Sequence, residues 1–190
     1  MVPLVLTAAD ARYPARLHER LGESAPALVT LLGNVDLLDL FKTALFCSAS
    51  SPGHTILAAY DQAARWRDAG RCVISGFHSP VEKECLCILL RGRQPVMICL
   101  ARGLDGMRLP AEWMQPLADN RLLVLSQFPA AARRVTKSLA TDRNRLVTAL
   151  ADEVVFAHVS PGGHLDELRQ LVASWRVLQR VLADGGKPPP

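Results

Sequence analysis

The stretch from Ala44 to Gly76, ALFCSASSPGHTILAAYDQAARWRDAGRCVISG, decides the fold class of this 190-residue chain. It begins and ends with short apolar runs, 44–47 and 72–74, which are typical of strands covered on both faces. Between them, apolar residues recur about every 3.6 positions and predict a helix from about His54 to Ala69, ended by Gly70. A strand, a helix and a second strand in this order indicate an α/β domain.

The same alternation continues through the rest of the chain. Six short apolar runs are predicted strands: Leu28–Leu32, Ala44–Cys47, Cys72–Ile74, Pro95–Leu100, Leu122–Leu125 and Val154–Ala157. Three further helices are expected: one begins at the capping box Ser79-Pro80-Val81-Glu82, one ends near Ala151, and one runs from about Leu165 to Leu182. The expected architecture is α/β, a Rossmann-like, mostly parallel sheet with helices on both faces.

The chain is expected to have three parts. Residues 1–40 are predicted to form a lead-in or small cap, residues 41–182 the Rossmann-like domain, and residues 183–190, rich in Gly and Pro, a disordered tail. Hydrophobic residues make up 49% of the chain and charged residues 21%, which suits one globular core.

Several classes of protein are disfavoured by what the sequence lacks. No apolar run reaches about 18 residues and no signal-peptide pattern begins the chain, so we expect a cytoplasmic protein with no membrane contact. The five cysteines contain no C-x-x-C pair and are expected to be reduced and mostly buried. Walker, G-x-S-x-G, H-E-x-x-H and G-x-G-x-x-G motifs are absent, so neither an enzyme nor a cofactor is predicted.

Loops rich in Ser and Gly follow four of the predicted strands. Because parallel strands place their carboxyl ends at one edge of a sheet, these loops are expected to lie together and to offer backbone N–H groups to a phosphate. For any single loop, the simpler explanation is that tight turns use small residues. The candidate phosphate-binding residues in these loops are Ser48, Ser50, Gly53, Ser75, Gly76, Gly162 and Gly163.

Basic residues concentrate in one part of a chain whose net charge is only +4. Between Arg121 and Arg145, six basic residues accompany a single acidic residue, Asp142. This local excess favours a polyanionic partner, and a solvated helix face is the alternative. The candidate residues for binding nucleic acid or phosphate in this stretch are Arg133, Arg134, Lys137, Arg143, Asn144 and Arg145.

Arg143 and Arg145 stand where helix structure alone does not favour arginine. If Asp142 caps a helix, both arginines oppose its dipole in the first turn. If the helix begins near Val135, Arg143 falls on the apolar stripe formed with Leu139 and its neighbours. An anion bound by both arginines resolves the conflict, and a salt bridge to a nearby carboxylate is the alternative.

Four histidines, His54, His78, His158 and His164, are expected at the same edge. A metal site is one interpretation of this group. Supporting carboxylates are poorly placed for metal ligation, so hydrogen bonding to a phosphate or a base is favoured and no metal is predicted.

The order of these motifs resembles the DprA/Smf DNA-processing family, part of the SLOG group of Rossmann-like domains. The resemblance runs from Tyr13 to about Trp175 and includes Tyr13-Pro14-Ala15-Arg16-Leu17, Ser75-Gly76 and Gly162-Gly163. Its most specific element is Arg143-Asn144-Arg145, which matches the family's Arg-Asn-Arg helix. Ser48-Ala49-Ser50 departs from the family's Gly-Ser/Thr-Arg loop, and the family's last strand is expected to be missing, so the chain resembles a divergent, minimal member.

The resemblance implies a non-enzymatic module that binds single-stranded DNA and hands it to a RecA-type recombinase in natural transformation. One alternative is a sensor of a free nucleotide, because Pro161-Gly162-Gly163 resembles the start of a phosphoribohydrolase motif whose later positions are replaced here by Leu165, Asp166 and Arg169. A structural protein without a ligand is a third reading. The helix expected from Leu165 to Leu182 offers a homodimer face, although packing on the sheet is favoured.

Overall fold

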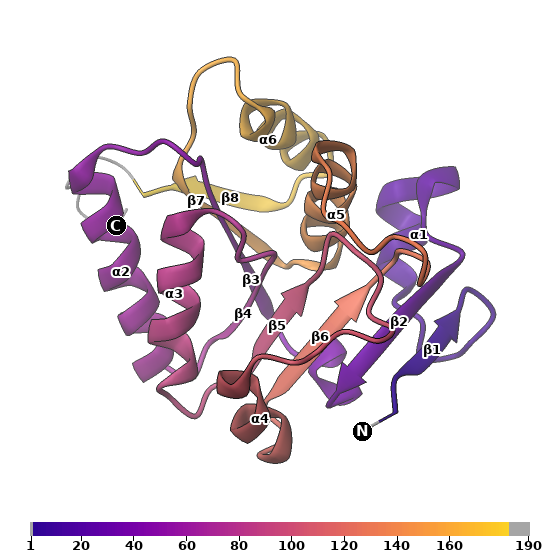
Figure 1. Ribbon diagram of the computed structural model, residues 1–190. Coiled ribbons are helices and arrows are strands. Elements are labelled where there is room, and N and C mark those ends of the chain that lie inside the picture. The colour runs from indigo at the N-terminus through magenta and orange to yellow at the C-terminus, as the bar shows by residue number, and fades with distance from the viewer. Residues whose placement is uncertain (1, 183–190) are drawn as a thin grey trace.

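The computed structural model, which describes residues 2–182, has three layers (Figure 1). The middle layer is an eight-stranded sheet with the strand order β1-β2-β6-β5-β4-β3-β7-β8. Its strands are β1 (Leu4–Thr7), β2 (Leu28–Gly33), β3 (Lys42–Cys47), β4 (Cys72–Ser75), β5 (Val96–Cys99), β6 (Leu122–Ser126), β7 (Glu153–His158) and β8 (Leu178–Val181). The helices are α1 (Ala15–Leu21), α2 (Gly53–Asp68), α3 (Pro80–Leu90), α4 (Ala111–Ala118), α5 (Lys137–Leu150) and α6 (His164–Ser174), with short 3-10 turns η1 (Gly22–Ser24) and η2 (Val35–Asp39).

The predicted α/β, Rossmann-like architecture is confirmed. The six predicted strands correspond to β2 through β7, and all pairs among β3 to β8 are parallel. Only β2 runs against its neighbours, since it pairs antiparallel with both β1 and β6. The sheet is therefore mostly parallel, as expected.

Helices cover both faces of the sheet because successive side chains on each strand point to opposite sides. In β3, Ala44 and Phe46 face a core shared with α1, α5 and α6. Leu45 and Cys47 face a second core shared with α2, α3 and α4. Every residue of β3 is buried, which explains the uninterrupted apolar run in its sequence.

The last predicted helix is corrected by the structure. It ends at Ser174, and β8 follows as a strand parallel to β7. Arg176 makes the turn with a φ of 56°, a conformation that a helix does not contain. Leu178 is 65% exposed, so the apolar spacing that suggested a longer helix does not continue a buried stripe. The further strand whose absence is expected after Gly186 falls outside the described residues.

Helix α5 begins at Lys137, where the Thr136 side chain caps it by accepting a hydrogen bond from the Leu139 N–H at 3.2 Å. This agrees with the early start near Val135 and excludes Asp142 as the cap. Arg143 lies on the buried face of α5, as that alternative required. Val135, however, is 44% exposed and does not join the stripe.

The first 40 residues contribute β1 and β2 to the same sheet. The boundary at residue 40 between a lead-in and a Rossmann-like domain stays a prediction. The expected tail, 183–190, lies outside the described residues. Four of the five cysteines are buried and Cys87 is exposed. No helix within residues 2–182 is long and apolar enough to cross a membrane.

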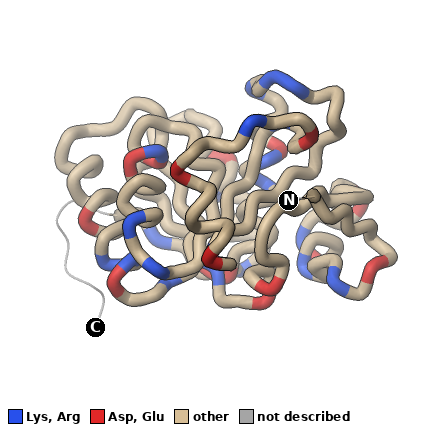
Figure 2. Tube along the Cα trace, turned by 60° about the horizontal axis from the view of Figure 1, so that its bottom comes forward, with Lys and Arg blue, Asp and Glu red and all other residues tan. Residues whose placement is uncertain are grey.

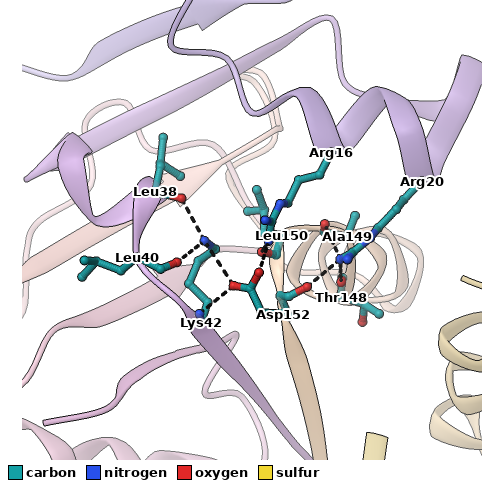
Figure 3. A network of polar contacts seen from close by, with 10 residues as sticks. Arg16, Arg20, Leu38, Leu40, Lys42, Thr148, Ala149, Leu150 and Asp152 are labelled. Carbon is teal, nitrogen blue, oxygen red and sulfur yellow. Dashed lines mark hydrogen bonds and ion pairs between the residues drawn. The ribbon is translucent and has the colours of Figure 1, made fainter. Parts of the chain in front are cut away.

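A polar network joins the N-terminal segment to the C-terminal end of α5 and to the start of β3 (Figure 3). Arg16 of α1 donates to the Leu150 carbonyl at 3.1 Å and to Asp152 at 2.6 Å, and Arg20 donates to the Ala149 carbonyl at 2.9 Å. These guanidinium groups satisfy carbonyls that have no partner within α5 and lie at the negative end of its dipole.

Lys42 completes the network from the start of β3 and is only 1% exposed. Its ammonium group donates to the Leu38 carbonyl at 2.8 Å, and its backbone N–H donates to Asp152 at 2.8 Å. Burial raises the pKa of Asp152, but the Lys42 N–H and the Arg16 guanidinium outweigh burial, so the pKa lies below its ordinary value.

Replacing Asp152 with Asn tests this network. The substitution leaves the buried Lys42 ammonium without its carboxylate, and we expect the free energy of unfolding to fall by about 2 kcal/mol in urea titrations. Because the folded pKa of Asp152 is depressed, its stabilisation is complete above the unfolded pKa of about 3.9 and is lost as pH falls through the lower folded value. The difference between wild type and Asp152→Asn should therefore narrow below about pH 4.

The matched control is Asp68→Asn, which removes an exposed partner of Arg67. It should change stability by less than about 0.5 kcal/mol, because exposed ion pairs contribute little. Equal effects of the two substitutions would contradict the structural role of Asp152.

Candidate nucleic-acid interface

The carboxyl edge of the sheet carries the loops that the sequence places together. From β3 the chain moves through β4 and β5 to β6, and it then returns to the other side of β3 as β7. In open α/β sheets, ligands commonly bind at such a reversal of strand order. Here the Ser48 N–H donates to the His158 carbonyl at 3.0 Å, and the Ser160 N–H donates to the Ser48 hydroxyl at 3.0 Å.

A buried carboxylate holds two of the edge loops in place. Glu82, 5% exposed, accepts hydrogen bonds from the backbone N–H groups of Cys47 at 2.8 Å, His78 at 2.8 Å and Ser79 at 3.3 Å. The Ser79 contact and the Ser79 hydroxyl form the predicted capping box of α3. Burial raises the pKa of Glu82, although the N–H groups and the charge of Arg143 act in the opposite direction.

Much of the hydrogen-bonding capacity of these loops is therefore used within the protein. Ser75 is fully buried, and its hydroxyl donates to the Leu45 carbonyl at 2.7 Å and accepts from the Phe77 N–H at 3.2 Å. The Gly163 N–H donates to the Ser160 carbonyl at 3.0 Å. Sequence reasoning identified the small residues but not these internal partners, because Glu82 reaches Cys47 across 35 positions.

The remaining small candidates lie at the loop surfaces. Ser50 and Gly53 are exposed, and Gly53 is the first residue of α2. Gly162 is exposed with a φ of 67°, a backbone conformation that favours glycine. Gly163 caps the N-terminus of α6. These positions lie at the surface of the loops that follow β3 and β7, and their contact with phosphate stays a prediction.

Arg143 lies inside the edge rather than on it. It is 4% exposed, and its Nη1 donates to the Cys99 carbonyl at 3.3 Å. Its Nε is buried and has no hydrogen-bond partner among the described residues, and no carboxylate there forms an ion pair with Arg143. Burial lowers the pKa of Arg143, and the charge of Glu82 partly opposes this effect.

Gly76 supplies the space that Arg143 occupies. A Cβ atom at position 76 would lie 1.3 Å from Arg143 Nη1, which no real contact allows. The Ser-Gly pair after β4 and the first arginine of Arg-Asn-Arg are therefore one structural unit. This close approach explains both residues without a ligand, and a role for either in binding stays a prediction.

Asn144 and Arg145 face another region, a groove of about 410 Å³ between α1, α5 and α6. Arg145 is exposed and Asn144 is half-buried. The other residues that line the groove are Arg20, Leu21, Ser24, Thr141, His164, Glu167, Leu168, Gln170, Leu171 and Trp175. Arg145 also borders a second hollow of about 360 Å³ with Gln127 and Phe128, so it joins this groove to the β6–α5 segment.

Arg133 and Arg134, on the segment between β6 and α5, and Lys137, the first residue of α5, are all exposed. The stretch 127–141 contains no acidic residue, whereas acidic and basic residues are interspersed over most of the trace (Figure 2). A hydrogen bond from the Gly103 N–H to the Ala132 carbonyl, at 2.8 Å, fixes this segment beside the loop after β5. The three cations therefore form an exposed positive region at the carboxyl edge.

No three His, Cys, Asp or Glu side chains within residues 2–182 are placed to hold a metal ion. Of the four edge histidines, His54, His78 and His164 are exposed and His158 is half-buried. Burial and the charge of Arg143 lower the pKa of His78. Their hydrogen bonding to a phosphate or a base stays a prediction.

Comparison with known proteins identifies relatives of this arrangement. A family model described as DNA recombination-mediator protein A matches residues 4–165. DNA processing protein A from Streptococcus pneumoniae is similar in structure, with a TM-score of 0.74 and 20% identity over 94% of this chain and 61% of that one. The chain thus spans about three fifths of that protein. No curated protein matches the chain.

Two further solved structures are similar in fold. DNA processing protein A from Helicobacter pylori, described for its single-stranded DNA binding mode, has a TM-score of 0.73 and 19% identity over 94% of this chain and 80% of that one. The molybdenum cofactor binding protein from Rippkaea orientalis has a TM-score of 0.51 and 10% identity over 74% and 75%. At these identities the structural likeness establishes the fold alone.

A double-mutant cycle tests the Gly76–Arg143 unit. We expect Gly76→Ala to lower the free energy of unfolding by about 2 kcal/mol, because its methyl group overlaps the guanidinium. In an Arg143→Ala background the same substitution should cost little, since the space is then empty. Gly53→Ala is the control, because a Cβ there meets nothing within 4 Å. Additive effects at positions 76 and 143 in urea titrations would refute the unit.

Proposed function

Because the chain belongs to the DNA recombination-mediator protein A family, we propose that it is a non-enzymatic module that binds single-stranded DNA. The proposed interface is the carboxyl edge of the sheet. A single observation carries this placement: Arg133, Arg134 and Lys137 are all exposed in a stretch that contains no carboxylate. Clustered cations of this kind neutralise successive phosphates and release their counterions.

Arg145 continues the positive region from that segment toward the α1–α5–α6 groove. A strand that crosses the β6–α5 segment would meet Arg145 next, with the Asn144 amide beside it. The loops at Ser48–Gly53 and Ser160–Gly163 lie farther along the same sheet edge and are proposed to contact the backbone there. The buried Arg143 supports this surface from beneath by holding the Gly76 turn in place.

Family membership and the described role of the Helicobacter pylori neighbour both support DNA as the ligand. The proposal extends to a cytoplasmic location, a RecA-type recombinase as partner and a homodimer as the assembly. These extensions follow from the family resemblance. DNA binding by this chain can be measured separately from the effect of a recombinase partner by using the purified chain alone.

A second candidate function is the binding of a free nucleotide, favoured by the groove between α1, α5 and α6. Its volume of about 410 Å³ lies in the range of small-ligand sites. Asn144, Arg145 and Trp175 line it and offer an amide, a cation and an aromatic ring. Such a set suits a phosphorylated base as well as a nucleotide within a strand.

Substitution of the three exposed cations tests the main proposal. The variant Arg133→Gln/Arg134→Gln/Lys137→Gln should bind a dT20 oligonucleotide at least tenfold more weakly in fluorescence anisotropy. Each phosphate contact contributes about 0.7 to the slope of log affinity against log salt for single strands, so the slope should become shallower by about 2. The control is Arg12→Gln/Arg169→Gln/Arg176→Gln, which removes equal charge from the N-terminal segment, α6 and the turn after it. Equal affinities of the two folded variants would disprove the proposed interface.

Thermal shift assays separate the two candidate functions. Binding to the native state raises the melting temperature, so the oligonucleotide should stabilise the chain while millimolar AMP and ATP should leave it unchanged. Stabilisation by a nucleotide, abolished by Asn144→Ala, would favour the sensor instead.

A further inference from the structure

We propose that the opposite edge of the sheet, where the parallel strands begin, forms a second contact for single-stranded nucleic acid. This edge carries Arg67, Arg71, Arg91, Arg93 and Arg121, which we call the arginine edge. The inference rests on the proposed DNA-binding function but uses none of its residues. It assigns a role to a positive surface that the carboxyl edge does not account for.

The arginine edge follows the order of the strands. Arg71 directly precedes β4 and Arg121 directly precedes β6, while Arg91 and Arg93 lie in the turn that leads into β5. Because β4, β5 and β6 are neighbours in the sheet, their approaches are about 4.8 Å apart and form a row. Arg67 joins the row from the last turn of α2, where its side chain packs against Gly92.

Internal contacts account for only part of this charge. Cations favour helix C-termini, and Arg121 does donate to the Leu90 carbonyl at the end of α3, at 3.0 Å. Arg67 pairs with Asp68 at 2.8 Å and Arg121 with Asp119 at 3.5 Å.

The side chains of Arg91 and Arg93 are exposed and make no hydrogen bond or ion pair within residues 2–182. Asp39, two positions before Phe41, is an exposed carboxylate without an ion pair among the described residues. Figure 2, turned to bring this side forward, shows several blue segments with red ones among them at the lower left. The edge therefore retains a net positive charge that is free to act on a partner.

An aromatic ring extends the row by one strand. Phe41 directly precedes β3, the neighbour of β4, and is 54% exposed. The Arg71 guanidinium lies over this ring, with its Cζ 5.3 Å from the ring centroid. The row from β3 to β6 thus spans about 14 Å and ends in an exposed aromatic platform.

This combination favours a single strand over other polyanions. Unpaired bases stack on exposed aromatic rings while adjacent arginines bind the phosphates, and arginine adds cation–π contact to the stacked base. A duplex presents no free base face to Phe41. An acidic protein segment would use the guanidinium groups but gain little from the ring beside them.

The two edges lie at opposite ends of the same strands. A six-residue strand such as β3 is about 20 Å long, so the two contacts are separated by roughly that distance. Helices about 10 Å across cover both faces of the sheet, so a nucleic-acid strand that touched both edges would have to pass around them over roughly 40 Å, which is too far for dT6. One chain therefore has room for two independent DNA segments.

Stoichiometry with a short oligonucleotide tests this inference. Isothermal titration of the chain with dT6 at low salt should give two molecules bound per chain. The variant Arg71→Gln/Arg91→Gln/Arg93→Gln should bind one, and so should the carboxyl-edge variant Arg133→Gln/Arg134→Gln/Lys137→Gln. The triple Arg12→Gln/Arg169→Gln/Arg176→Gln controls for total charge and should still bind two. Phe41→Leu, which removes the ring but keeps an apolar side chain, should weaken one of the two sites at least threefold.

The outcomes distinguish this inference from the proposed function. One outcome is that the wild-type chain binds a single dT6, and that this binding disappears in the carboxyl-edge variant but persists in the arginine-edge variant. That result overturns the second contact and leaves the proposed carboxyl-edge interface standing. If the wild-type chain binds one dT6 and only the arginine-edge variant loses this binding, the result supports the second contact and contradicts the carboxyl-edge site. Binding of polyglutamate that depends on the arginine edge, with dT6 binding unaffected, would assign the edge to an acidic protein and overturn the inference.

Discussion

The arrangement of the carboxyl edge depends on one buried carboxylate. Glu82 accepts three backbone N–H groups that belong to two different segments, the end of β3 and the turn that starts α3. A buried carboxylate is costly unless its oxygens are satisfied, and these three N–H groups satisfy them. They set the path of the β4–α3 turn, and that path brings Gly76 against the Arg143 guanidinium. Ser75-Gly76 and Arg143-Asn144-Arg145 therefore meet next to this set of hydrogen bonds.

The central part of the fold could be predicted because its signal is local and strong. Strands β2 through β7 are short apolar runs, and the capping box at Ser79 marks the start of α3. The two edge strands lacked such a signal. Apolar spacing in 165–182 suits a helix, and only hydrogen bonding to β7 makes Leu178–Val181 a strand. Helix α4 contains Pro116, a residue that argues against a helix when the sequence is considered alone.

The sequence could predict where the candidate loops lie, but not which of their polar groups are free to bind a ligand. Strand order brings the Ser- and Gly-rich loops together, as their sequence positions implied. Which of their polar groups remain available is decided by distant partners, as the link from the Ser160 N–H to Ser48 shows. The Arg-Asn-Arg motif divides in the same way. Its first arginine is buried against Gly76, while Asn144 and Arg145 line an open groove.

The network around Asp152 has a consequence for how the chain is made. Arg16 and Arg20 bond to carbonyls that lie 134 and 129 positions later in the sequence, and β2 pairs with β6. On a ribosome that adds roughly 5–20 residues per second, the first helix waits on the order of ten seconds for its partners. During that time Leu6, Val29 and Leu31, buried in the finished sheet, have nothing to cover them. Strands β1 and β2 are therefore the part of the sheet that waits longest for its neighbours during synthesis, and apolar strands left uncovered favour aggregation.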